Sequence, residues 1–183
     1  MARFLVFFIS GIQTKGLGRI LAFNCALECF PMNISEIITP SRIELNLTLR
    51  TKHELLEYLP GILLRNGDTD DIHEVRRVIF ERERLMSTGI GYGIALPHGK
   101  TNSVKKTTAA LITLSSAIDY DSLDGLPVQI IVMLVGKEDQ VSTHLKLLSK
   151  ISRLISSDSF RYYALNATKP EQIHKLLVQA DEE

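Results

Sequence analysis

Two runs of β-branched and aliphatic residues constrain the fold of this chain more than any other feature of its sequence. They span residues 108–114 and 128–135, and a polar turn region separates them at residues 119–127. Runs with so little interruption by polar residues are typical of strands that other elements cover on both faces. We therefore expect two central strands in the sheet of a layered α/β fold.

The rest of the chain alternates helical and strand patterns, without a low-complexity linker or an internal repeat. Residues 43–47 alternate apolar and polar side chains, which predicts a half-buried strand near a sheet edge. Helical stripes of apolar residues predict three helices, over residues 53–64, 71–84 and 141–155. A last helix is expected after Thr168, with Thr168 as N-cap and Glu171 as the second half of a capping box. We expect the acidic tail at residues 181–183 to be solvated.

Composition excludes several classes of protein. The chain has 183 residues, 45% of them hydrophobic, which suits one domain with a substantial core. Lys plus Arg and Asp plus Glu both number 21, so no basic excess favours nucleic acid or an anionic membrane as a partner. Cys25 and Cys29 have no second Cys or His pair at zinc-finger spacing, which argues against a zinc site and against a disulfide scaffold. The lack of cysteine from Met32 onward fits a reducing, cytoplasmic environment.

Residues 1–31 differ in composition from the rest of the chain. Their two apolar bursts, at residues 4–9 and 20–23, are each far shorter than the roughly 20 apolar residues of a membrane-spanning helix. A secretory signal peptide fits poorly, because the first burst is short and no clear cleavage pattern follows it. We expect this segment to be an apolar extension upstream of a natural start at Met32, and residues 32–183 to form the functional domain.

One histidine stands at the end of a glycine-rich stretch. Glycines at positions 89, 91 and 93 precede a short apolar run that ends in Pro97, His98 and Gly99. Glycine permits close approach of a bulky group, and proline fixes the backbone that enters the histidine. A neutral imidazole is a nucleophile that needs no separate activating base. A surface or structurally satisfied histidine is the alternative, but the simplest hypothesis is that His98 carries a covalently attached group.

Several ordered motifs extend this pattern and resemble one family. They are Arg82-Glu83, Ser87-Thr88-Gly89-Ile90-Gly91, Gly93-Ile94-Ala95-Leu96-Pro97-His98-Gly99-Lys100, Asp124-Gly125-Leu126-Pro127-Val128 and His144-Leu145-Lys146-Leu147-Leu148. In these residues the chain resembles a type-2 enzyme IIA domain of the bacterial phosphoenolpyruvate-dependent sugar phosphotransferase system, of the fructose, mannitol and nitrogen-regulatory branch. The resemblance covers the chain from Ile34 to the last helix. It implies an α/β fold with a mixed, mostly parallel central sheet flanked by helices on both faces.

The resemblance also implies a phosphoryl carrier and assigns its residues. His98 would accept a phosphoryl group from the phosphocarrier protein HPr or a paralogue, while Arg82 and His144 would stabilise the phosphate. The resemblance implies no cofactor and no metal, and the sequence has no Walker motif or kinase signature that would indicate a nucleotide donor. Three residues, Thr88, Gly89 and Gly91, are candidates to line a pocket around the phosphoryl group. A role in turn geometry alone is an equal alternative for them.

The sequence leaves open which protein such a carrier acts on. It also leaves two other classes of function open. Sugar-transport versions pass the phosphoryl group to an enzyme IIB partner, whereas nitrogen-type versions bind regulatory target proteins, and we favour the nitrogen type. An interaction module that keeps the fold without transferring phosphate is a second class, against which the presence of Arg82, His98 and His144 argues. A metal-dependent hydrolase built on the two histidines is a third, but no carboxylate stands at a recognised ligand spacing.

Overall fold

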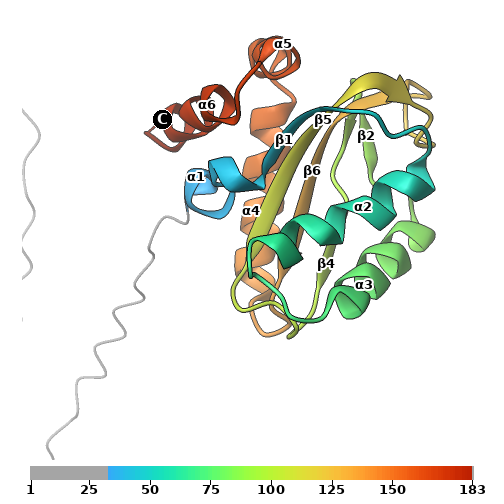
Figure 1. The fold of residues 1–183 in the computed structure, drawn as a ribbon, viewed down its shortest axis with the longest axis vertical. Helices are drawn as coiled ribbons and strands as arrows, with labels where there is room; N and C mark the ends of the chain where they lie inside the picture. Colours follow the sequence, from blue (N-terminus) through green and yellow to red (C-terminus); the bar gives the residue numbers. More distant parts are fainter. Residues whose placement is uncertain (1–32, 183) are drawn as a thin grey trace, which may run out of the picture. The chain divides into compact units, whose positions relative to one another are not determined.

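A mixed sheet of six strands forms the centre of the structure, a computed structural model that describes residues 33–182 (Figure 1). The strands along the main path follow the order β1-β5-β6-β3-β2, and β4 pairs with β6 beyond β3. The elements, in chain order, are α1 (Ile34–Ile37), the 3₁₀ helix η1 (Pro40–Arg42), β1 (Ile43–Leu47), α2 (Lys52–Arg65), α3 (Ile72–Leu85), β2 (Gly89–Gly91), β3 (Ile94–Ala95), β4 (His98–Lys100), β5 (Thr108–Ile118), β6 (Val128–Gly136), α4 (Val141–Ile155), α5 (Asp158–Asn166) and α6 (Pro170–Glu182).

The pairing confirms the predicted mixed sheet. β1 runs parallel to β5, and both β3 and β4 run parallel to β6. β5 and β6 pair antiparallel over most of their length, and β2 pairs antiparallel with β3. β1 lies at one edge, as the alternating pattern of residues 43–47 predicts.

Helices cover both faces of this sheet, so the two longest strands are buried on both sides as predicted (Figure 1). Alternate residues of β5 point to opposite cores: Leu111 packs with α1, α4, α5 and α6, whereas Ile112 packs with α2 and α3. Both side chains are fully buried. The near-continuous apolar runs thus reflect two separate cores on one sheet.

One expectation near the carboxyl end is wrong, and another holds only in part. The start of α6 is not closed by a Thr168–Glu171 capping box: the Gln172 side chain accepts hydrogen bonds from the backbone amides of Thr168 and Lys169, at 2.8 and 3.1 Å. In the acidic tail Glu182 is exposed as expected, but the Asp181 side chain is only 6% exposed; its carboxylate accepts from the amides of Ile34 and Ser35 and pairs with Lys150. These bonds attach the last helix to the start of α1.

The expectations for residues 1–31, including a natural start at Met32, fall outside the described residues. None of the helices in the described part of the chain is both long and apolar enough to cross a membrane.

Candidate functional site

His98 opens β4, and a backbone carbonyl holds its ring. Pairing of His98 with Leu134 of β6 sets the position of the strand, and the Pro97 carbonyl accepts the Leu134 amide at 3.0 Å. His98 Nδ1 lies 2.8 Å from the Leu96 carbonyl oxygen. Because a carbonyl only accepts hydrogen bonds, Nδ1 carries the proton and Nε2 has the free lone pair.

Arg82 reaches that lone pair from the last turn of α3. Its Nε donates to His98 Nε2 at 3.1 Å, and its Nη1 donates to the Met86 carbonyl at 3.0 Å. α3 and β4 approach closely because residue 99 is glycine: a Cβ there would lie 2.8 Å from Val78 Cγ2. The glycine after the histidine therefore allows the strand to bring His98 up to the helix that carries Arg82.

His144 completes a cluster of three side chains. It lies in the first turn of α4, is 4% exposed, and its ring centroid is 5.9 Å from that of His98. Its Nδ1 is buried without a hydrogen-bond partner among residues 33–182. Gly136, at the end of β6, faces this atom so closely that a Cβ would lie 2.5 Å from it.

Burial shifts the titration of both rings. Desolvation lowers the pKa of His98 and the Arg82 charge lowers it further, while the bond to Leu96 and the Glu83 charge act in the opposite direction. For His144, desolvation with the nearby charges of His98 and Lys100 lowers the pKa to about 4. Both imidazoles are therefore predominantly neutral at pH 7.

The three side chains line a cleft of about 440 Å³ between α3, β4 and the start of α4. Arg77, also in its wall, is tied to Glu74 and Glu81, which leaves Arg82 and Lys100 as the cations whose charge faces the cleft. The wall also contains three exposed apolar side chains, Leu85, Val141 and Leu145. Such a site offers a neutral nucleophile, a guanidinium and an apolar surface for a partner.

The three other residues proposed from the sequence lie elsewhere. Thr88 is buried, and its backbone amide and hydroxyl both donate to the Glu83 carboxylate. Gly91 has a φ of +96° beside the Asp124 carboxylate, and Gly89 packs against Ser122, so both serve the turn geometry. None of the three belongs to the described residues that line the cleft.

The sequence does not predict two residues that matter for the geometry around the site. Glu83 belongs to the Arg82-Glu83 motif without a predicted role of its own, and glycine is needed at position 136 only because the His144 ring packs against it. No sequence signal distinguishes Glu83 from the other charged residues of α3, because its burial follows only from the fold. No group of three or more His, Cys, Asp or Glu within residues 33–182 has the arrangement of a metal site.

Comparison with known proteins decides the family. The sequence model of the phosphoenolpyruvate-dependent sugar phosphotransferase system, EIIA 2, matches residues 36–180. The chain belongs to this family. It is thus a type-2 EIIA domain, of a family of phosphotransfer components that includes sugar-specific and nitrogen-regulatory members.

Relatives of both kinds match this EIIA chain. The fructose-specific EIIABC component of Bacillus subtilis is 34% identical over 82% of this chain, although the match spans only 24% of that protein. The fructose-specific EIIA component of Haloferax volcanii is 30% identical, over 82% of this chain and 100% of its own length. The nitrogen regulatory protein of Pseudomonas aeruginosa is 29% identical, over 80% of this chain and 96% of its own.

Solved EIIA structures share the fold. The nitrogen regulatory protein IIA-Ntr of Neisseria meningitidis is 33% identical, with a TM-score of 0.74 over 79% of this chain and 98% of that one. The mannitol IIA of Escherichia coli, at 18% identity and a TM-score of 0.66, matches in fold.

Proposed function

We propose that this chain is a phosphoryl carrier that accepts a phosphoryl group on Nε2 of His98 from the phosphohistidine of an HPr-type carrier protein. The state of the histidine ring is the observation that carries this proposal. Because the Leu96 carbonyl holds the proton on Nδ1, the lone pair of Nε2 faces the cleft side that Arg82 occupies. A ring fixed in this tautomer is already the nucleophile that the reaction requires.

The transfer step balances without a cofactor. The Nε2 lone pair of His98 attacks phosphorus in line, the bond from phosphorus to the donor imidazole breaks, and the donor nitrogen keeps that electron pair. His98 retains its proton on Nδ1 throughout. The only chemistry left to the protein is to position the two rings and to stabilise the charge of the phosphoryl oxygens.

We assign the stabilisation of that charge to Arg82 and His144. A phosphoryl group on Nε2 displaces the Arg82 Nε hydrogen bond and brings its oxygens to the same guanidinium. In the tautomer with its proton on Nε2, neutral His144 donates from Nε2 to a phosphoryl oxygen, and the unpartnered Nδ1 holds the lone pair. The start of α4 at Val141 adds the partial positive charge of a helix N-terminus.

The surface around His98 suits a protein as donor. Leu85 and Leu145 are 82% and 60% exposed beside the cleft, and an apolar rim around a charged centre is typical of a protein docking site. We favour a regulatory output of the nitrogen type, supported by the match in fold to the nitrogen regulatory protein IIA-Ntr, with a TM-score of 0.74 against 0.66 for the mannitol IIA. A carrier of this kind works in the cytoplasm.

A sugar-transport role is the second candidate, because fructose-specific components match at 34% and 30% identity. An enzyme IIB partner is the acceptor in that case. Incubation of the phosphorylated chain with enzyme IIB proteins distinguishes the two roles: the nitrogen type retains its label, and the sugar type passes it to a IIB cysteine.

The carrier proposal is tested with enzyme I, an HPr-type carrier and labelled phosphoenolpyruvate. We expect acid-labile label on the wild type only when all three are present, and none on His98→Ala. Label from ATP alone, undiminished label on His98→Ala, or no label on the wild type with any HPr-type carrier would reject it.

A further inference from the structure

Glu83 is a buried carboxylate outside the cleft, one residue after Arg82. Its side chain is 5% exposed. The carboxylate accepts from the Thr88 amide at 3.0 Å, from the Thr88 hydroxyl, and from the Tyr120 hydroxyl at 3.3 Å. Lys52 Nζ, at the start of α2, lies 2.9 Å from it.

This cluster is fully satisfied and spans several elements. Lys52 also lies 3.2 Å from Asp121 and 4.6 Å from the centroid of the Tyr120 ring, and Tyr120 is fully buried. A buried charge with so many partners fixes the geometry of the groups around it, because the loss of any partner leaves a desolvated charge. Glu83 therefore holds the last turn of α3 against the segment that follows it.

Two hydrogen bonds connect Thr88, in that segment, to His98 by way of Leu96. The Thr88 carbonyl accepts the Leu96 amide at 2.9 Å, and the Leu96 carbonyl accepts from His98 Nδ1 at 2.8 Å. Thr88 is thus bound on one side by Glu83 and on the other by the residue that orients the histidine ring. On the helix side, Arg82 precedes Glu83 directly and closes the same turn through its bond to the Met86 carbonyl.

We propose that Glu83 is a positioning residue for phosphoryl transfer, which sets the distance between the Arg82 guanidinium and the His98 nucleophile by tying α3 to Thr88. The inference rests on the proposed function of His98. Glu83 does not line the cleft and makes no hydrogen bond to either ring, so its bonds act on Arg82 and His98 through the elements that it joins, while its negative charge also raises the pKa of His98. Misplacement of catalytic groups by an ångström costs one to two orders of magnitude in rate.

The principal test compares Glu83→Gln with a matched control, Asp68→Asn. Asp68 is equally buried and bonds Arg42 through both oxygens, at 2.6 and 2.5 Å, but lies outside the cleft lining. We expect Glu83→Gln to lower the rate constant of transfer from the phosphorylated HPr-type carrier about tenfold or more, with KM for the carrier unchanged. Asp68→Asn should stay within about twofold of wild type at a similar loss of Tm. Equal rates for the two variants overturn the proposal.

A double-mutant cycle tests whether Glu83 acts through Arg82. In the Arg82→Ala background, Glu83→Gln should cost about twofold at most, because the distance that it sets no longer matters. If it costs the same factor as in the wild type, the proposal is wrong. Should Glu83→Gln fail to unfold cooperatively, Thr88→Val replaces it, with an expected loss of about threefold; an unchanged rate contradicts the proposal.

A readout without phosphoryl transfer separates this inference from the proposed function. In the unphosphorylated protein, nitrogen NMR reports the hydrogen bond from Arg82 Nε to His98 Nε2. We expect the scalar coupling across this hydrogen bond, which depends on the distance between the two nitrogens, to be lost in Glu83→Gln and unchanged in Asp68→Asn. An unchanged coupling in Glu83→Gln overturns the positioning role even if His98 is phosphorylated, and its loss supports the role even if the chain accepts no label.

Discussion

Arg82 donates from Nε to Nε2 of His98 across 3.1 Å, and the same guanidinium closes the end of α3 through the Met86 carbonyl. The bond links two residues 16 positions apart in the sequence, one on a helix and the other on a strand. It places a permanent cation at the atom that we propose as the nucleophile. The phosphoryl charge therefore develops where a donor is already positioned.

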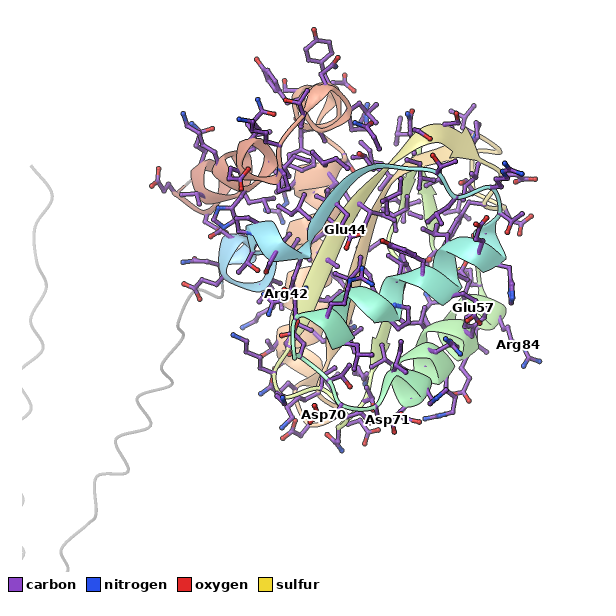
Figure 2. The ribbon with its side chains drawn as sticks, in the orientation of Figure 1. Arg42, Glu44, Glu57, Asp70, Asp71 and Arg84 are labelled. Atoms are coloured by element: carbon purple, nitrogen blue, oxygen red, sulfur yellow. The ribbon has the colours of Figure 1, made fainter. Side chains whose placement is uncertain are left out.

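Removal of this guanidinium should slow transfer strongly. We expect Arg82→Ala to reduce the rate of His98 phosphorylation by about 10²-fold, as for other groups aimed at developing charge. Arg84→Ala is the matched control, because Arg84 lies on the same turn but is exposed and projects away from the sheet (Figure 2). It should stay within about twofold of wild type. Equal losses in rapid-quench measurements would remove Arg82 from the mechanism.

The low pKa of His144 predicts a dependence of stability on pH. The ring has a pKa of about 4 in the folded protein against 6.5 as its ordinary value, so the unfolded chain binds more protons between these values. Its contribution is complete above pH 6.5 and is lost as the pH falls toward 4. Between pH 7 and 4.5 this loss is on the order of 2–3 kcal/mol.

Urea unfolding of His144→Gln measures that contribution. The variant should lose less stability than the wild type over the same pH range, by roughly the stated amount. Parallel pH curves for the two proteins would show that His144 is not held neutral by the fold.

The fold should require glycine at position 136, because the His144 ring packs against it. In Gly136→Ala a Cβ would lie 2.5 Å from His144 Nδ1, so the ring must move. We expect a loss of about 1–3 kcal/mol in unfolding free energy, together with slower transfer. Adding His144→Ala should recover most of the stability. Gly61→Ala, inside α2 and near only the end of the Arg65 side chain, should stabilise by up to about 1 kcal/mol with an unchanged rate.

The apolar rim should affect recognition of the donor more than chemistry. Leu145 is 60% exposed beside the cleft, so Leu145→Asp should raise KM for the HPr-type carrier about fivefold or more and leave the rate constant unchanged. Tyr162→Asp, on α5 at a similar exposure, is the control and should change neither. A fall in the rate constant without a change in KM would contradict a docking role for this rim.

Periodic patterns made the larger part of the fold predictable. The helix expected over residues 141–155 is α4 at the same bounds, because its apolar residues Leu147, Ile151 and Ile155 face one core. The two apolar runs are β5 and β6 at the centre of the sheet. Where one face of an element meets one core, the spacing of its side chains carries the information.

The rest depends on contacts distant in sequence. β4 is only three residues long and exists because His98 pairs with Leu134, and no local pattern encodes that partner. The Asp181 carboxylate accepts a hydrogen bond from the amide of Ser35, which lies 146 residues earlier in the sequence. α5 was not predicted, since its short sequence buries little beyond Phe160 and Ala164. In the site, the glycine-rich motif points to His98 and the family resemblance points to Arg82 and His144, whereas the structural role of Thr88 follows only from its hydrogen bond to Glu83.

Nitrogen NMR of the phosphorylated chain, labelled with ¹⁵N in its histidines, tests the central claim most directly. After incubation with enzyme I, an HPr-type carrier and phosphoenolpyruvate, we expect coupling of phosphorus to Nε2 of His98, with Nδ1 still protonated toward Leu96. Phosphorus bound to Nδ1 of His98, or to any other histidine, would contradict the account.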